Sequence, residues 1–283
     1  MLSLAFISGF VHDDVEVVTL GGRGDKIAVI ELVGPIVVAD DVVRQFKKYH
    51  EDRSIRAILF RVDSPGGGVV ASQEIYDEVK KTRDDGKPVV ASMGALAASG
   101  GYYVSCGANK IMANPGTLTG SIGVISEFVS VDSLLHKFGI VPNTIKSGKM
   151  KDAGNPFRPM TTEDRTYFQN LMDNVHKQFI DVVEKERHLN HDTLIVLADG
   201  RVFTGEQALT LKLIDTLGTY EDAISLTAQL AHIKGAPTLV KERRRTNSLF
   251  DRIFGEAKIP DFLGLKDDFF NQPILQYRLL HGL

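Results

Sequence analysis

The 283-residue chain has a single cysteine, no tryptophan and no strong excess of either charge. One thiol excludes an intrachain disulfide, and without a cluster of cysteines and histidines it cannot form a structural zinc site. Cys106 lies on a stretch of apolar and small residues, so we expect a buried, unreactive thiol. The formal net charge of −3 gives no general attraction for nucleic acid, and we predict no nucleic-acid partner.

A long hydrophobic run is also absent. The apolar N-terminal stretch ends at Val11, whereas about 20 apolar residues are needed to span a bilayer. No basic residue precedes this stretch, so it lacks the pattern of a signal peptide. We interpret residues 1–25 as an N-terminal segment whose apolar part is the remaining end of a membrane anchor.

Short runs of β-branched residues alternate with helical patterns over residues 26–235, which predicts one α/β domain. Residues 57–62 and 89–93 are two of its expected strands, and each leads into a loop of small residues. Open α/β sheets place their sites at such carboxyl ends of strands. A long helix is predicted to begin at Thr161, with its apolar stripe, which runs to Phe179, in the core.

Residues 236–283 are expected to form a C-terminal extension, which contains a basic run and ends in a tail rich in apolar residues. The basic run is interpreted as a solvated linker. The tail should dock on its own domain, a partner subunit or a membrane surface. Because residues 273–280 have the character of a peptide substrate, we predict that they reach an active-site groove of this or a neighbouring chain.

Ser99 is the candidate nucleophile, because the residues around it are mostly glycine and alanine. Such small neighbours leave room for a substrate carbonyl and let backbone N–H groups approach closely. A serine hydroxyl also needs a base to take its proton. No histidine lies in the same stretch, and His136 falls on a surface-like helical turn, so a Ser-His-Asp triad lacks a clear middle member.

Lysine is the alternative base. A free lysine has a pKa of about 10.4, so it accepts a proton near neutral pH only where desolvation favours the neutral amine. The segment 146–152 carries Lys146, Lys149 and Lys151, and its composition neither chooses among them nor excludes that all three are solvated loop residues.

Consecutive glycines follow a predicted strand in residues 63–68, whose sequence is DSPGGG. Glycine N–H groups aimed at a tetrahedral oxyanion are worth about 3 kcal/mol each. The same glycines also fit a tight turn before a helix. A phosphate-binding loop is disfavoured, because the Gly-Lys-Ser/Thr ending is absent.

Four segments taken together resemble signal peptide peptidase A, a family of bacterial serine proteases, in its short single-repeat form. In chain order they are residues 63–68, 92–103, 119–124 and 147–152. The similarity covers about residues 26–231. It implies the Clp protease/crotonase-like α/β fold, in which ββα units stack into a single compact domain.

The resemblance also implies roles for individual residues. Ser99 is expected to be the nucleophile and Lys151 the general base, both from one protomer, with Ser121 orienting the lysine amine. No metal or other cofactor is implied. The oxyanion-hole donors implied by the resemblance are the N–H of Gly100 and that of Gly66 or Gly67.

Members of this family form dome-shaped homo-oligomers in which neighbouring subunits help shape the sites. They are anchored in the bacterial cytoplasmic membrane with the protease domain on its extracytoplasmic side, where they degrade cleaved signal peptides. We expect the same of this chain, with unfolded hydrophobic peptides as its substrates. Two alternatives stay open. A crotonase-type acyl-CoA hydratase or isomerase would use the glycine loops but leave Ser99 and Lys151 idle, and a non-catalytic scaffold would keep only the fold.

Overall fold

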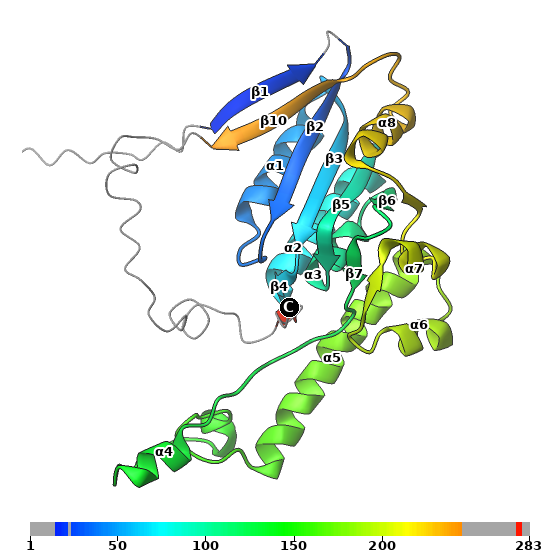
Figure 1. The fold of residues 1–283 in the computed structure, drawn as a ribbon. Helices are drawn as coiled ribbons and strands as arrows, with labels where there is room; N and C mark the ends of the chain where they lie inside the picture. Colours follow the sequence, from blue (N-terminus) through cyan, green and yellow to red (C-terminus); the bar gives the residue numbers. More distant parts are fainter. Residues whose placement is uncertain (1–14, 22–23, 245–275, 279–283) are drawn as a thin grey trace, which may run out of the picture.

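The computed structural model describes residues 15–21, 24–244 and 276–278 (Figure 1). Its centre is a nine-stranded sheet in which β1, β10, β2, β3, β5, β6 and β9 lie side by side in this order, while β7 pairs with β5 and β8 with β7. The strands of this sheet are β1 (Val15–Gly21), β2 (Lys26–Val33), β3 (Ile55–Ser64), β5 (Val89–Ala98), β6 (Lys110–Ala113), β7 (Leu118–Gly120), β8 (Val202–Thr204), β9 (Thr216–Leu217) and β10 (Thr238–Arg244).

Strands β2, β3 and β5 form the parallel centre of the sheet and are covered on both faces. Each contains an unbroken run of buried residues, as expected for strands without a solvent-facing side. Strand alternation decides which layer each side chain joins: Ile30 and Phe60 pack in the larger core, whereas Val29 and Leu59 face the smaller one. The predicted α/β fold is confirmed.

Helices complete the two cores. Phe46 and Ile75 contribute to the larger core, while Ala223 and Ala228 close the smaller one on the opposite face of the sheet. The helices that cover the sheet are α1 (Asp40–Glu51), α2 (Val69–Asp84), α3 (Gly100–Ser105), α6 (His191–Leu197), α7 (Gly205–Thr210) and α8 (Tyr220–Leu230). No helix in the described ranges combines the length and hydropathy needed to cross a membrane.

The edge of the sheet is built from both flanking segments. Strand β10 pairs in parallel with β2, and β1 pairs antiparallel with β10. The sheet thus includes residues 15–21, which the sequence assigns to the N-terminal segment, and residues 238–244, which it assigns to the C-terminal extension. The other described strand of that extension is β11 (Gln276–Arg278), which lies beside the candidate site.

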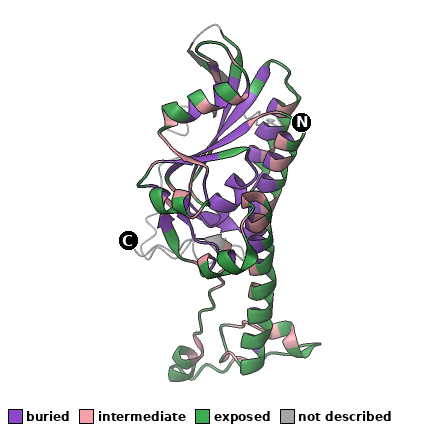
Figure 2. Ribbon diagram, turned by 90° about the vertical axis from the view of Figure 1, so that its right-hand side faces the viewer, coloured by how far each residue is buried: buried purple, intermediate pink, exposed green. Residues whose placement is uncertain are grey.

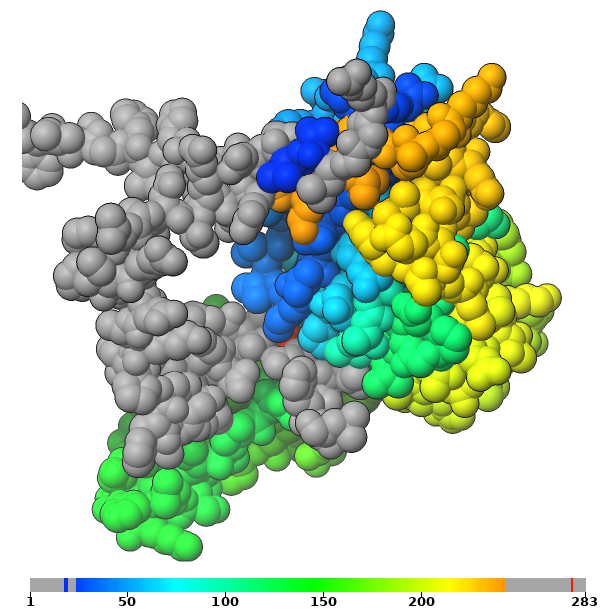
Figure 3. Space-filling view, turned by 45° about the horizontal axis from the view of Figure 1, so that its top comes forward, coloured from blue at the N-terminus to red at the C-terminus, as the bar shows by residue number. Residues whose placement is uncertain are grey.

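An arm, defined here as residues 126–174, leaves the body beyond β7 and returns along α5 (Thr162–Arg187) (Figures 1 and 3). It also carries α4 (Asp132–Lys137) and the 3₁₀ turn η1 (Lys149–Asp152). Asp164 is its only buried residue, and Figure 2 shows the exposed residues running along its length.

The long helix α5 begins as predicted, because Thr161 and Asp164 form a capping box. The prediction for its apolar stripe is wrong in the first half. Phe179 is fully buried in the core, but Leu171 is 36% exposed because this earlier part of α5 still lies in the arm. Helical periodicity identifies an apolar face without saying what covers it.

Candidate active site

Three of the four predicted site segments meet at the carboxyl ends of three neighbouring parallel strands, β3, β5 and β7. Ser99 follows β5 and Ser121 follows β7, and the Ser99 N–H donates a 2.7 Å hydrogen bond to the Gly120 carbonyl. The structure therefore brings Ser99 and Ser121 to adjacent strand ends, although 22 residues of sequence separate the two serines.

Ser99 itself has an unusual backbone, with φ 56° and ψ −116°. A positive φ costs a residue with a side chain about 1–3 kcal/mol and persists only where its surroundings impose it. Here the Ser99 N–H is held by Gly120, while its carbonyl accepts the Tyr103 N–H at 2.8 Å. The side chain is 1% exposed, and its Oγ has no hydrogen-bond partner among the described residues. A buried hydroxyl left unpaired destabilises the fold, which makes Ser99 a candidate functional residue.

The small residues around Ser99 also serve packing. A Cβ on Gly101 would lie 2.7 Å from the Ser64 carbonyl oxygen, and one on Gly94 would lie 2.5 Å from the Asp63 carboxyl carbon. Such distances are closer than side chains tolerate, so part of the glycine content lets α3 and β5 approach β3. The sequence-based interpretation of these residues as space for a substrate is therefore incomplete.

The glycines after β3 form a short strand, β4 (Gly66–Gly68), fixed against Ile36. Ile36 donates to the Gly66 carbonyl at 2.8 Å and accepts the Gly68 N–H at 2.7 Å. The Gly66 N–H donates to Ser64 Oγ at 3.1 Å, so one of the expected oxyanion donors already has a partner. Backbone groups of successive strand residues point to opposite sides, so those of Gly67 face away from Ile36.

Strand β11 occupies the side of β4 that Gly67 faces. It runs antiparallel to β4, with Tyr277 opposite Gly67. On its other side, Gln276 accepts the Ile125 N–H at 3.1 Å and donates to the Ile125 carbonyl at 3.3 Å. An extended segment therefore fits between β4 and Ile125, beside the start of α3. Of the three docking surfaces expected for the tail, its own domain is therefore the one that these residues contact.

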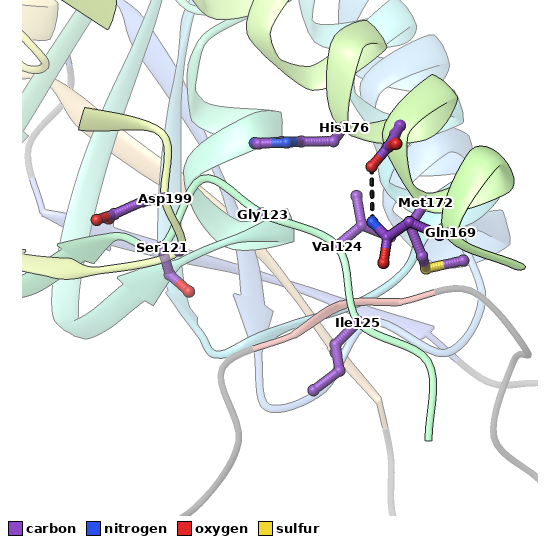
Figure 4. Close-up of a pocket in the computed structure, with 10 residues that line it drawn as sticks. Ser121, Gly123, Val124, Ile125, Gln169, Met172, His176 and Asp199 are labelled. Atoms are coloured by element: carbon purple, nitrogen blue, oxygen red, sulfur yellow. Dashed lines mark hydrogen bonds between the residues drawn. The ribbon is translucent and has the colours of Figure 1, made fainter. Parts of the chain in front are cut away.

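A cavity of about 480 Å³ adjoins Ser121 at the base of the arm (Figure 4). His176 points into this region from α5, and its Nε2 is buried without a hydrogen-bond partner among the described residues. The sequence analysis did not predict that α5 lines this cavity, although the α5 residues that do so recur at the spacing of one helical face. The cavity is lined by Ser121, Gly123, Val124, Ile125, Gln169, Met172, Asp173, His176, Asp199 and Gly200.

Lys151 lies elsewhere. It is exposed on the turn η1 of the arm, and no contact among the described residues joins it to Ser99. The single chain therefore gives no contact that supports the expectation that one protomer supplies both residues. The neighbouring lysines have carboxylate partners: Lys149 pairs with Glu163 and Lys146 with Asp152. No ion pair joins Lys151 to any residue that the structure describes. These ion pairs thus distinguish Lys151 from Lys146 and Lys149, whereas the composition of the segment could not.

Cys106 is buried as predicted, and burial raises the pKa of its thiol to about 12. Such a thiol is neutral at physiological pH and is a poor nucleophile. Within the described ranges, no cluster of three or more histidine, cysteine or acidic residues is arranged to hold a metal ion.

The family model of peptidase family S49 matches residues 81–234, and that of Clp protease matches residues 24–117. The chain belongs to peptidase family S49. This confirms the family indicated by the four sequence segments, the Clp protease-like fold, and the assignment as a serine protease. It also favours the protease over the acyl-CoA hydratase and the scaffold.

Relatives support the same assignment over most of the chain. The Synechocystis protein slr0021 is 45% identical over 207 residues, which cover 73% of this chain and 74% of that protein. Protease 4 of Haemophilus influenzae is 32% identical over 217 residues, 74% of this chain and 35% of its own length. The chloroplastic serine protease SPPA of Arabidopsis thaliana is 33% identical over 248 residues, 86% of this chain and 36% of its own.

Proposed function

We propose that this S49 peptidase is a Ser/Lys endopeptidase that cleaves extended, unfolded hydrophobic peptides such as signal peptides released after secretion. The observation that carries the proposal is the strand position between β4 and Ile125, next to Ser99. A peptide added there as an antiparallel strand has its backbone fixed by hydrogen bonds, and side-chain pockets then provide selectivity. The cavity beside Ser121 is a pocket of this kind.

In the proposed reaction, the Lys151 amine takes the Ser99 proton and Oγ attacks the scissile carbonyl carbon. The N–H groups of Gly100 and Gly67 then hold the charged carbonyl oxygen. Protonated Lys151 returns the proton to the leaving amine as the C–N bond breaks. Water attacks the acyl-enzyme by the same route and releases the carboxylic acid product. Ser121 accepts a hydrogen bond from the lysine amine and orients it.

Gly66 has no donor role in this proposal, because its N–H is already bonded to Ser64. The Gly67 N–H instead faces the strand position where a substrate carbonyl would lie. Gly100 is the first residue of α3, where backbone N–H groups lack partners within the helix. The two donors belong to β4 and α3, which are in contact, and in this proposal they converge on the carbonyl oxygen.

We further propose that Lys151 acts on Ser99 of a neighbouring copy in a homo-oligomer. The arm that carries Lys151 also exposes apolar side chains, including Phe138 at 74% and a fully exposed Ile145. Burying this surface against a second copy would stabilise an assembly at about 25 cal/mol per Å² of apolar area. It would also remove water from around the amine, and desolvation is what favours a neutral lysine base.

Membrane attachment is part of the proposal and rests on the family and on the apolar stretch before His12, which lies outside the described residues. The protease domain is placed on the extracytoplasmic side of the bacterial cytoplasmic membrane. Protease protection of intact and lysed spheroplasts tests this. Protection that disappears only when the cytoplasmic membrane is opened would contradict the proposed topology.

Mixed assemblies test the catalytic proposal. Ser99→Ala and Lys151→Ala should each be inactive alone on an unfolded protein substrate. Co-expressed in equal amounts, they should recover about one quarter of wild-type activity, as random pairing of an intact serine with a neighbour's intact lysine requires. Lys149→Ala, an arm lysine paired with Glu163, is the matched control and should retain activity.

Each part of the proposed mechanism can be refuted by a different result. Activity in Ser99→Ala would refute the nucleophile, and activity near neutral pH in Lys151→Ala would refute the base. Two inactive variants that do not complement would place both residues in one protomer. A serine-directed phosphonate should label Ser99, whereas protection by an acyl-CoA without labelling would support the hydratase.

A further inference from the structure

The turn that carries Lys151 contains no buried residue. Asp164 is the only buried residue of the whole arm. In the body, by contrast, Ser99 follows a strand that lies in the core. The rings of Phe128 and Phe168, whose centroids lie 4.2 Å apart, pack beside Gly154, but no buried core reaches η1 itself. Polar contacts therefore contribute to fixing the place of Lys151.

Arg158 makes the contacts that fix this turn. Its Nε donates to Asp152 Oδ2 at 3.0 Å, and its Nη2 donates to the Asp152 carbonyl oxygen at 2.8 Å. Nη2 also donates to Asp164 Oδ1 at 3.1 Å, while Nη1 reaches Asp164 Oδ2 and the Pro159 carbonyl. A guanidinium has five N–H donors, and each of them has an acceptor here. Arg158 thus joins the residue next to Lys151 to the start of α5.

Both carboxylates are themselves anchored. Asp164 accepts the Thr161 N–H at 3.0 Å and caps α5, and its side chain is 3% exposed. Asp152 also pairs with Lys146, which donates to the Lys149 carbonyl on η1. Arg158 and Lys146 hold the pKa of Asp152 at about 2, and Arg158 lowers that of Asp164 well below its usual range. The carboxylates therefore keep their charge at neutral pH, and the network persists.

We propose that Arg158 is a positioning residue for the reaction: by clamping Asp152 to Asp164, it fixes the turn that delivers Lys151 to Ser99. This rests on the proposed role of Lys151. Arg158 does not reach the reacting atoms, so its effect passes through Asp152. A misplacement of about 1 Å costs on the order of 100-fold in rate, which is the size of effect that such a clamp controls.

The first test compares two arginines that each bridge two carboxylates. Arg158→Ala should lower kcat by about 10- to 100-fold with little change in KM, because substrate binds at β4 and the base is misplaced. Arg158→Lys should recover only part of the loss, since a lysine cannot span both carboxylates as a planar fork does. Arg44→Ala, which breaks the Arg44 contacts to Asp41 and Glu242 on the body, should leave kcat unchanged. Equal kcat in Arg158→Ala and wild type would overturn the proposal.

Mixed assemblies separate positioning from folding. In the pair of Ser99→Ala and Lys151→Ala chains, Arg158→Ala is added to one chain at a time. Added to the Ser99→Ala chain, which supplies the working lysine, it should remove at least nine-tenths of the recovered activity, matching a loss of about 10-fold or more. Added to the Lys151→Ala chain, which supplies the working serine, it should leave that activity intact.

Equal loss in both placements would show a general structural role and overturn the proposal. A pair that is inactive without any change at Arg158 would refute only the placement of the dyad across two copies. In that case the kcat values of homogeneous Arg158→Ala and Arg158→Lys enzymes decide the role of Arg158.

Discussion

The body and the arm hold their proposed catalytic residues by different physical means. Ser99 and Ser121 stand at the ends of β5 and β7, whose backbones are fixed by the sheet and whose surroundings are buried. Lys151 lies on an arm that has no buried apolar residue, where an ion-pair network around Arg158 holds the turn. The proposed nucleophile is thus preorganised within one chain, whereas the proposed base requires, in our proposal, an assembly to complete its environment.

Replacing the nucleophile should give the largest change in activity. Ser99→Ala should lower turnover by at least about 10⁴-fold, as the loss of a serine nucleophile does in other serine proteases. It should not lower the free energy of unfolding, because the Ser99 hydroxyl has no hydrogen bond among the described residues. Peptide cleavage and thermal denaturation of the same preparation measure both.

Ser105→Ala is the matched control on α3. The buried Ser105 hydroxyl donates to the Gly101 carbonyl at 2.7 Å, so its loss should cost about 1 kcal/mol of stability while activity is retained. If Ser99→Ala destabilised the protein as much as Ser105→Ala, Ser99 would be a structural residue.

The body and the arm should differ in how well a glycine tolerates replacement by alanine. A Cβ on Gly67 would lie 2.1 Å from the Ile36 carbonyl oxygen, whereas nothing lies within 4 Å of one on Gly148. Gly67→Ala should therefore cost about 1–3 kcal/mol in the free energy of unfolding and displace the groove, by which we mean the strand position between β4 and Ile125. Gly148→Ala should be nearly neutral. Chemical denaturation measures the two values. Similar costs would contradict the rigid body that the site requires.

Removing the tail tests the groove of the body. A chain that ends at Gly255 lacks β11, so a peptide substrate would no longer compete with Gln276–Arg278 for β4. We expect a several-fold lower KM for unfolded peptides, because the share of chains with an open groove increases. Steady-state kinetics with full-length and shortened chains measure this. Unchanged kinetics and assembly would show that the tail does not compete with substrate.

Acid should loosen the arm before the sheet. The folded-state pKa values of Asp152 and Asp164 lie below those of the unfolded chain, so their stabilisation is present above about pH 4 and is lost as the pH falls toward 2. Limited digestion with pepsin between pH 4 and 2 should cut first within residues 126–174, while the far-ultraviolet circular dichroism of the body persists. First cuts in the sheet would contradict this order.

Sequence patterns predicted the body better than the arm, for a physical reason. The strands around residues 57–62 and 89–93 are buried by their own chain, so their apolar runs indicate both structure and position. The stripe on α5 has the same periodicity over its whole length, yet only its later part, including Phe179, is buried in the core of this chain. Periodicity reports an apolar face and not which molecule covers it.

The same reasoning applies to the site. The glycine strand, Ser99 and Ser121 follow adjacent parallel strands, so their proximity could be expected from the α/β pattern. The sequence could not predict the cavity wall on α5 or the exposed position of Lys151, because both depend on how segments distant in sequence are arranged. It also could not predict that the Gly66 N–H is occupied, because this depends on where the Ser64 side chain points.

The central claim is that the body of one copy and the arm of another complete the site. A structure of the full-length assembly with a phosphonate covalently bound to Ser99 tests it most directly. The account predicts that the Lys151 amine of a neighbouring copy lies within about 2.6–3.2 Å of Ser99 Oγ. An assembly in which the lysine beside Ser99 belongs to the same chain, or in which no lysine lies there, would contradict it.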